Sequence, residues 1–406
     1  MATDNDLVLV ARHLAAALCL LGFAACQAIT GLDEFSISST ASAPDPGAPE
    51  ACQPGWHACD GTCTDLSGDP LHCGACGSAC GTGEICVDAQ CTCPSHRPRC
   101  AGGCVDLRTD PQHCGACEHD CSGQTCADAL CAPELLMTGL GTLRALAVTH
   151  GALFWTEASP GRVSSIPSSG GARTDHATSP APHALAVEGD TLCWTDSVAA
   201  EIVALDLTSG VTSVLATNQP SAYALALAGG FAYWTTYEVG EVLRIPRSGG
   251  PLEHIASSQV GAFGLAVGDH HVYWVNQDGG AILRSPLDGD ALPEPIATEC
   301  PAPRAIAVDE SHVYWIDNVG IMRHDTLAGG PLVPLTEPPV SPHSFVLGGA
   351  YLYSTDEDGT IRRIPTAGGE PLSLAVDQAL PSAIALDATH VYWHNAGDGT
   401  LMRVAR

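Results

Sequence analysis

The feature that most constrains this chain is a two-residue motif that recurs seven times in its C-terminal part and is aromatic at both positions in five copies. The second residues of successive copies lie 39 to 41 positions apart. A constant period of this length predicts an array of equal structural units. The copies are Phe154-Trp155, Cys193-Trp194, Tyr233-Trp234, Tyr273-Trp274, Tyr314-Trp315, Tyr353-Ser354 and Tyr392-Trp393.

Each unit is predicted to contain four short β-strands and no helix. In the fourth unit these strands are "GLAV", "HVYWVN", "AILRSP" and "PEPIAT", with a glycine-rich turn at Asp278-Gly279-Gly280 between the middle two. One such sheet has two apolar faces and cannot bury both alone, but sheets packed radially cover one another. We therefore predict an all-β, seven-bladed β-propeller whose aromatic pairs form the core between blades.

The two ends of the array indicate how the ring closes. The last unit ends after its third strand, in "GTLMRVAR", and the segment "PELLMTG" before the first unit resembles a fourth strand such as "PLEHIAS". We expect Glu134 to Thr138 to complete the last blade, because a closed ring leaves no exposed strand edge. The propeller is assigned to residues 132–406.

Sixteen of the 20 cysteines lie in two copies of one pattern, at residues 52–91 and 93–131. Such density indicates an oxidising compartment. Each copy holds eight cysteines, enough for four disulfides, and 105 pairings are open. Modules of ~40 residues with few large apolar side chains need covalent closure, because they cannot bury a sufficient core.

Two kinds of segment have spacings that metal sites also use. Cys73-Gly-Ala-Cys76 and Cys114-Gly-Ala-Cys117 are spaced like zinc ligands, although disulfides are favoured in an exported chain. Asp356-Glu357-Asp358-Gly359 and Asn276-Gln277-Asp278-Gly279 resemble fragments of calcium loops, but both lack the later glutamate and fall at expected hairpin turns. We favour disulfides and turns, and predict no bound metal and no cofactor.

Both repeat systems resemble known families. The matched segments "CTDLSGDPLHCGACGSAC" and "CVDLRTDPQHCGACEHDC" resemble the stigma-specific cysteine-rich protein family, which implies an extracellular, interaction-related role. The propeller units resemble the YWTD-type repeats of lipoprotein receptors, most clearly "CWTD" at Cys193 to Asp196, and are similar to NHL-type repeats. Receptor YWTD propellers have six blades and this chain has seven units, so the resemblance implies the fold and not a receptor role.

The N-terminus is predicted to direct export. An apolar run, "LAAALCLLGFAAC", is too short to span a membrane comfortably. It resembles a bacterial lipoprotein signal, residues 1–25, whose lipobox ends at Cys26, and this implies cleavage before Cys26 and acylation of its thiol. An ordinary secretory signal is the alternative. Residues 26–51, rich in Ser, Ala and Pro, are interpreted as a flexible tether. The expected location is the cell envelope outside the cytoplasm, at the outer membrane or cell surface.

The charge of the chain excludes one class of partner. It carries 45 acidic residues, 16 arginines and no lysine, for a formal net charge of −29. Binding to nucleic acid requires a basic surface that neutralises phosphates, so we expect no nucleic acid partner. The same charge favours solubility and is compatible with cation binding.

One position in each unit breaks the repeat. It lies at the start of the innermost strand, where the loops gather at one mouth of the central channel, and its residue type varies while its neighbours repeat. Packing fixes framework positions similarly in every blade, so this variation marks candidates for ligand contact in a concave pocket. Ordinary solvated channel residues are the alternative. The seven residues are Arg144, His183, Tyr223, Phe263, Arg304, His343 and Ser382.

These patterns favour a binding protein over an enzyme. The expected ligand is a small molecule, glycan or protein segment at the channel mouth, and no residue is assigned as catalytic because no serine nucleophile elbow or HExxH motif is present. The alternative is a propeller lyase or hydrolase that uses the histidine, arginine and tyrosine side chains there. His183 and His343 fall nearly across the ring, which disfavours a shared metal. Cys193 and Cys300 are expected to be free thiols.

Overall fold

The computed structural model describes residues 52–289, 291–325, 331–336 and 341–406. The expected signal peptide, the tether and the acylation site Cys26 lie outside these residues. Among the described residues we find no helix with the length and apolar character needed to cross a membrane.

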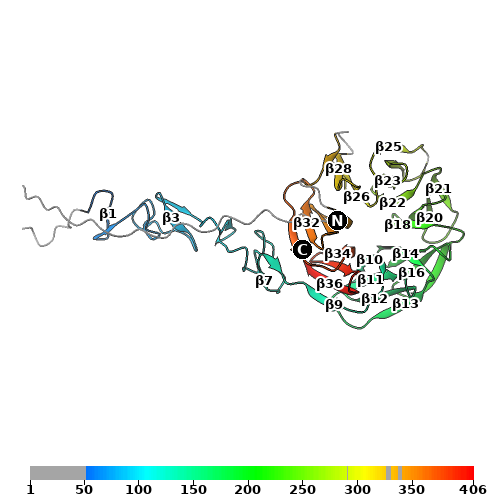
Figure 1. Ribbon diagram of the computed structural model, residues 1–406, viewed down its shortest axis with the longest axis horizontal. Coiled ribbons are helices and arrows are strands. Elements are labelled where there is room, and N and C mark those ends of the chain that lie inside the picture. The colour runs from blue at the N-terminus through cyan, green and yellow to red at the C-terminus, as the bar shows by residue number, and fades with distance from the viewer. Residues whose placement is uncertain (1–51, 290, 326–330, 337–340) are drawn as a thin grey trace, which may run out of the picture. The chain divides into compact units, whose positions relative to one another are not determined.

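The C-terminal part of the chain is a seven-bladed β-propeller, as the repeat period predicted. Seven antiparallel sheets of four strands follow one another along the chain, and Figure 1 shows them arranged radially. Within each sheet, neighbouring strands are consecutive in sequence, except in the sheet that closes the ring. The described residues form 36 strands and no helix, so the fold class is all-β.

Each blade contributes one strand to each of four positions, from the channel outward. The inner strands are β10 (Leu143–Thr149), β14 (Pro182–Glu188), β18 (Ala222–Ala228), β22 (Ala262–Val267), β26 (Ile306–Val308), β30 (Pro342–Gly348) and β34 (Pro381–Leu386). The second strands are β11 (Ala152–Glu157), β15 (Thr191–Asp196), β19 (Phe231–Thr236), β23 (His271–Asn276), β27 (His312–Ile316), β31 (Tyr351–Asp356) and β35 (His390–Asn395). The third strands are β12 (Arg162–Pro167), β16 (Glu201–Asp206), β20 (Glu241–Pro246), β24 (Ala281–Pro286), β28 (Ile321–Asp325), β32 (Ile361–Pro365) and β36 (Thr400–Ala405). The outer strands are β13 (Thr174–Thr178), β17 (Thr212–Ala216), β21 (Glu253–Ala256), β25 (Glu294–Ala297), β29 (Val333–Pro334), β33 (Leu372–Ala375) and β9 (Glu134–Met137).

Buried clusters fill the walls between neighbouring blades, and the repeated pairs build them. The wall between blades three and four joins Tyr233 to Trp274, and the next wall joins Tyr273 to Trp315. The two residues of each pair therefore point to opposite faces of their sheet, because successive side chains in a strand alternate. This confirms that the aromatic pairs are core. In the wall between blades five and six, Ser354 stands where the other blades carry tryptophan.

Most indole nitrogens in these walls find hydrogen-bond partners, as buried polar groups require, whereas Nε1 of Trp155 has none among the described residues. Trp274 donates to the side-chain oxygen of Gln259 at 3.0 Å, and the amide of Asn276 donates to the same oxygen at 3.0 Å. In blade seven, Trp393 donates to Gln378 in the same way, at 3.1 Å. Each glutamine lies in the loop that leads into the inner strand, so these bonds fix the loops against the walls.

The ring closes with the segment that the sequence indicated. Strand β9 pairs with β36, so blade seven combines the first and the last strands of the propeller. Nε of Arg403 donates to the carboxylate of Glu134 at 2.7 Å, and its Nη1 donates to the carbonyl of Ser168 in blade one at 2.9 Å. One side chain of β36 therefore holds both the closing strand and the neighbouring blade.

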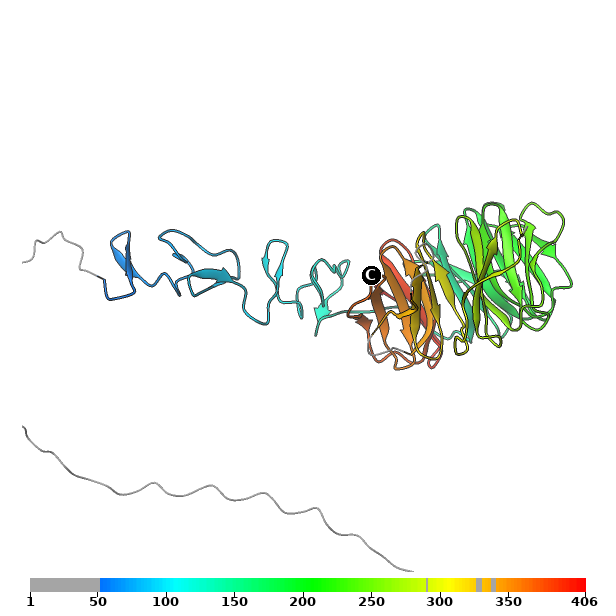
Figure 2. The ribbon, with the colours of Figure 1, turned by 90° about the horizontal axis from the view of Figure 1, so that it is seen from above.

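The cysteine-rich region consists of four small hairpins (Figure 2) held by eight disulfides. Both modules use one pairing: first with third cysteine, second with fifth, fourth with seventh and sixth with eighth. All sixteen clustered cysteines are thus disulfide-bonded, which leaves none as a zinc ligand. The hairpins are β1 (His57–Cys59) with β2 (Thr62–Thr64), β3 (Ile85–Val87) with β4 (Gln90–Thr92), β5 (Arg99–Cys100) with β6 (Gly103–Cys104), and β7 (Cys126–Ala127) with β8 (Leu130–Cys131). The disulfides are Cys52–Cys63, Cys59–Cys76, Cys73–Cys86, Cys80–Cys91, Cys93–Cys104, Cys100–Cys117, Cys114–Cys126 and Cys121–Cys131.

The second module packs against the propeller. Its disulfide sulfurs at Cys114 and Cys121 are fully buried in the same cluster as Leu374 and Trp393, which fills the wall between blades six and seven. Gly115 lies so close to Leu372 that an added Cβ would sit 3.1 Å from its methyl group. The second module therefore extends the core of the propeller.

Candidate functional site

Threonines of the second strands hold the backbone at the channel mouth. In three blades the threonine hydroxyl donates to the backbone carbonyl of the mouth residue in the next blade. The backbone of these mouth residues is therefore tied to the rigid walls, while their side chains are free to differ. The bonds run from Thr156 to His183 (2.7 Å), from Thr235 to Phe263 (2.7 Å) and from Thr355 to Ser382 (2.8 Å).

The structure brings all seven variable mouth residues onto the wall of one cavity, with a volume of about 460 Å³. This size is in the range of small-molecule sites. The remaining wall consists of small and aliphatic residues from the same segments, with one further serine. That these residues bind a ligand stays a prediction. The seven are Arg144, His183, Tyr223, Phe263, Arg304, His343 and Ser382.

The cavity is positively charged. Arg144 and Arg304 line it, and no aspartate or glutamate is among the described residues that form its wall. Nε of Arg304 is buried without a hydrogen-bond partner among the described residues. Although the whole chain carries a net charge of −29, this cavity, with two arginines and no carboxylate among its lining residues, offers an anion a favourable local potential.

Two histidines accompany the arginines. Burial lowers the pKa of His183; the carbonyl of Tyr223, 3.3 Å from Nδ1, partly offsets this, and the charge of Arg144 lowers it further. Burial also lowers the pKa of His343, and Arg304 acts in the same direction, against a small opposite effect of Glu357. Both rings are therefore neutral near pH 7 and gain positive charge only in more acidic solution.

An aromatic stack forms one side of the cavity. The ring of Tyr223 lies 4.3 Å from that of His183 and 3.9 Å from that of Phe263, measured between centroids. Burial raises the pKa of Tyr223, so its hydroxyl remains a donor at neutral pH. Tyr237 meets Phe263 edge-on at 5.9 Å, and its hydroxyl donates to Asp278 at 3.0 Å. The stack offers flat apolar surface beside the arginines.

A groove of about 470 Å³ adjoins this stack. Tyr237 lines the groove and also contacts the rings of Tyr223 and Phe263, so the groove and the central cavity are neighbours. Val239 and Val260 of the groove are 49% and 62% exposed. A ligand longer than the cavity would therefore have an apolar surface over which to extend.

A histidine that the sequence analysis did not select lies behind the cavity wall. Nδ1 of His394 is 3.0 Å from Oγ of Ser382, and His394 is completely buried. The sequence carries a signal for it: the equivalent position is threonine in blades one, two, three and six, as at Thr156 and Thr355. This departure from the repeat lies on the second strand, one strand away from the mouth position at which the sequence analysis selected its candidates.

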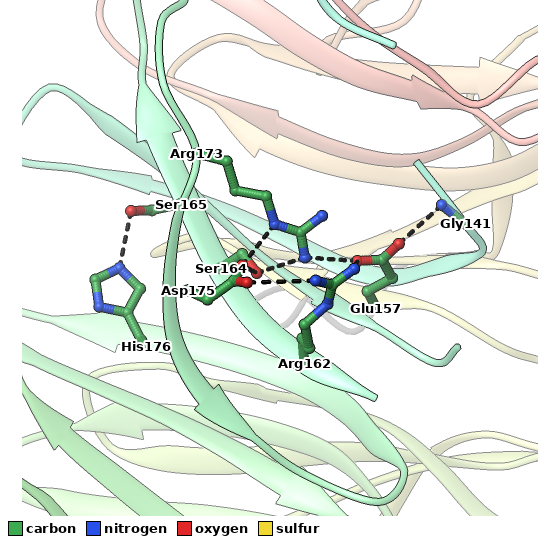
Figure 3. A network of polar contacts seen from close by, with 8 residues as sticks. All are labelled: Gly141, Glu157, Arg162, Ser164, Ser165, Arg173, Asp175 and His176. Carbon is green, nitrogen blue, oxygen red and sulfur yellow. Dashed lines mark hydrogen bonds and ion pairs between the residues drawn. The ribbon is translucent and has the colours of Figure 1, made fainter. Parts of the chain in front are cut away.

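A polar network in blade one, away from the cavity, is structural (Figure 3). The buried carboxylate of Glu157 accepts from Arg173 at 2.7 Å and pairs with Arg162 at 3.6 Å. Arg173 also binds Asp175 at 2.6 Å and covers the ring of Trp155, 5.4 Å from its centroid. These charges compensate one another and protect a wall tryptophan, and none of these side chains lines the central cavity.

The segments that resembled calcium loops are hairpin turns. Asp356 and Asp358 both pair with Arg362, which supplies a positive charge to this turn. Among the described residues, the groups compact enough for a metal all contain disulfide cysteines, and neither His183 nor His343 belongs to one.

Cys193 and Cys300, the two cysteines outside the modules that the structure describes, are free, as predicted, and both are buried. Burial raises the pKa of the Cys193 thiol to about 12 and that of Cys300 to about 11. Both therefore stay protonated at neutral pH, and neither is a nucleophile.

No family model matches the sequence, and no curated protein matches it. Solved propellers are similar in structure. Virginiamycin B lyase from Staphylococcus aureus is 18% identical, with 68% of this chain and 98% of that chain covered and a TM-score of 0.58. A catalytically inactive variant of that lyase, with a histidine changed to alanine and with quinupristin, is 18% identical over 68% and 98%, with a TM-score of 0.57. YCF48 bound to D1 peptide is 14% identical over 68% and 96%, with a TM-score of 0.52. At these identities the likeness shows the fold alone.

Proposed function

We propose that this protein is an exported binding protein whose central cavity binds an organic anion carrying an aromatic or other flat apolar group. The observation that carries the proposal is that Arg144 and Arg304 line a cavity without carboxylates in a chain of net charge −29. Guanidinium groups bind carboxylates and phosphates through paired hydrogen bonds. The stack of Tyr223 on Phe263 provides the apolar surface. The anion is a small molecule or an exposed group of a glycan or peptide.

Calorimetric titration with matched probes tests this proposal. Hippurate combines a carboxylate with an aromatic ring, and hippuramide is its neutral counterpart. We expect saturable binding of hippurate, at least about tenfold weaker binding of hippuramide, and an affinity loss of about tenfold in Arg304→Ala, because a hydrogen bond to a charged group contributes roughly 1.5–3 kcal/mol. Equal affinities for the two probes, or no saturable binding of benzoate, hippurate, indole-3-acetate and phenyl phosphate, would refute the proposal.

The second part of the proposal concerns location. The protein is held at the cell envelope, outside the cytoplasm, through an acylated Cys26, and the stigma-type modules separate the propeller from the anchor and offer an interaction surface. Eight disulfides support an oxidising compartment. Cys26→Ala should release the protein from membranes or block its processing. Unchanged membrane association together with an unchanged mature mass would contradict the anchor.

A lyase is the second candidate, because two similar structures are forms of virginiamycin B lyase and one of them was inactivated by replacing a histidine. His183 and His343 supply histidines to the cavity here. Incubation with quinupristin, followed by mass spectrometry, separates the two functions. Binding alone leaves the compound unchanged. Conversion that is lost in His183→Ala or His343→Ala would replace the binding proposal with the lyase.

A further inference from the structure

The cavity wall contains a serine and a histidine in hydrogen-bonding contact. Ser382 lines the cavity, and its Oγ lies 3.0 Å from Nδ1 of His394. The same hydroxyl is 3.3 Å from the backbone carbonyl of His394. The imidazole is completely buried behind the serine, so it can reach the cavity only through Oγ.

The repeat shows what this position needs for packing alone. Four blades place threonine there, at Thr156, Thr195, Thr235 and Thr355, and two place Val275 and Ile316. Where the residue is threonine, its hydroxyl is satisfied because it donates to the backbone carbonyl of a mouth residue, as in blades one, three and six. His394 instead leaves its buried Nε2 without a hydrogen bond of normal geometry among the described residues. Packing therefore gives no reason for histidine in blade seven.

The surroundings keep the imidazole in the form that can accept a proton. Burial lowers the pKa of His394, while Asp398, Glu157 and the backbone of Gly141 act in the opposite direction. The amide of Gly141 in turn donates to Glu157 at 2.9 Å, within the network of Figure 3. The ring is thus neutral near pH 7, and the Glu157 carboxylate acts in favour of the imidazolium that a proton transfer would form.

We propose that Ser382 and His394 are a nucleophile and general-base pair that hydrolyses small carboxylic esters in the central cavity. Oγ of Ser382 attacks the acyl carbon while its proton moves to Nδ1 of His394. The ester C–O bond breaks, and the leaving alkoxide takes that proton and departs as an alcohol. Water then attacks the acyl-serine, gives its proton to Nδ1, and the carboxylic acid leaves as the proton returns to Oγ. The net reaction is ester plus water to acid plus alcohol.

The charge of the cavity suits this reaction. Arg144, at the start of the neighbouring inner strand β10, lines the same cavity and offers positive charge to the oxyanion that forms on the acyl group. The proposal goes beyond ligand binding and does not depend on it. A neutral ester tests the pair even if no anion binds.

The experiment is labelling of the purified full-length protein with a fluorophosphonate probe, together with hydrolysis of p-nitrophenyl butyrate. We expect one labelled serine, Ser382, identified by peptide mass, and no label in Ser382→Ala. The variant His394→Thr restores the residue of four other blades and should therefore fold. It should slow both labelling and hydrolysis by about 100-fold or more, the usual contribution of a general base.

The chain provides a matched control. Ser165 also contacts a histidine, His176, at 2.8 Å, but neither lines the cavity (Figure 3). Ser165→Ala should leave labelling and hydrolysis unchanged, which shows that a serine–histidine contact alone does not react. Thermal melting of each variant confirms folding. The proposal is overturned if the folded wild-type protein is not labelled at Ser382, or if a folded His394→Thr variant is labelled as fast as the wild type.

Discussion

Tyr233 and Trp274 meet in the wall between blades three and four, and both are almost entirely buried. Tyr223 and Phe263 belong to the same two blades but lie at the cavity, where both remain partly exposed. The wall positions are nearly the same in every blade, whereas the mouth positions carry five residue types. Repetition therefore marks the residues that hold the ring together, and variation marks those whose side chains line the cavity.

His394 belongs to both regions, so the distinction between wall residues and mouth residues does not hold for it. By position it is a framework residue of the second strand, and by contact it is a partner of the mouth residue Ser382. Substitutions that separate stability from ligand affinity can therefore test the comparison residue by residue.

The largest effect is expected in the wall. Trp274→Ala should lower the free energy of unfolding by about 3–5 kcal/mol, because it removes a completely buried indole and leaves a cavity. Chemical denaturation measures this loss. Trp56, which is 48% exposed in the first cysteine-rich module, is the control, and Trp56→Ala should change the free energy by about 0.5 kcal/mol or less. Similar losses in both variants would break the comparison.

A smaller effect is expected where wall and mouth loop are joined. Gln259→Ala removes the acceptor of both Trp274 and Asn276, and leaving buried donors unpaired costs about 1–3 kcal/mol. Gln378→Ala should cost less, since Trp393 also donates to the side-chain oxygen of Asn395 at 3.1 Å and therefore keeps one acceptor. The denaturation curve of Gln259→Ala should therefore shift further than that of Gln378→Ala. Equal shifts would show that the second acceptor of Trp393 contributes nothing to stability.

The mouth should tolerate truncation. Arg304→Ala removes a side chain whose Nε has no protein partner among the described residues, so the free energy of unfolding should change by about 0.5 kcal/mol or less. The same variant should lose affinity for hippurate, as described above. Calorimetry and denaturation on one preparation measure both quantities. A large loss of stability would show that Arg304 is a structural residue of the propeller and not only a residue of the cavity.

The smallest effect concerns pH. The pKa values of His183 and His343 are lowered, so both are neutral at pH 7.5 and become charged as the pH falls below their ordinary value of about 6.5. The carboxylate of hippurate stays ionised in this range. Its affinity should therefore rise by up to about fivefold between pH 7.5 and pH 5.5, since one added charge is worth on the order of 1 kcal/mol. Titrations at both pH values with the wild type and with His183→Gln would measure this rise, which should be smaller in the variant. A hippurate affinity of the wild type that decreases as the pH is lowered would contradict the placement of these histidines beside the bound anion.

The same shifts have the opposite sign for stability. The unfolded chain binds protons on these histidines at a higher pH than the folded protein does. Their contribution to stability is therefore complete above about pH 6.5 and is lost as the pH falls. The gain in affinity must be measured while the propeller is still folded, which thermal melting at each pH establishes.

Most of the fold follows from the sequence because it depends on repeated, local patterns. The spacing of the aromatic pairs predicted seven blades, and the match of "PELLMTG" to the outer strands predicted that β9 closes the ring. The disulfide pairing did not follow, because eight cysteines in a short segment are all close in sequence. The pairing is selected by the folded hairpins, because their geometry determines which sulfur atoms come close enough to bond.

The candidate site was predictable in part. Variation against a repeated background selected the seven residues that line the cavity. It did not select His394, because the contact with Ser382 depends on how β34 and β35 are paired around an irregularity in register. The groove beside Tyr237 was also missed. It forms between loops of two neighbouring blades, and the sequence of one repeat does not show how close the loops of two blades lie.

The closing pair of strands has a consequence for how the protein is made. Glu134 of β9 and its partner Arg403 of β36 are 269 residues apart, so β9 leaves the ribosome long before the strand that it needs. Blade seven cannot form until the rest of the propeller exists. The unfavourable entropy of closing so long a loop is therefore offset by the contacts of blade seven only at that last step. The two cysteine-rich modules, whose disulfides span at most 17 residues, meet no such delay. A chain halted before β36 would therefore carry finished modules on an open array that exposes a strand edge, a form prone to pair with other chains.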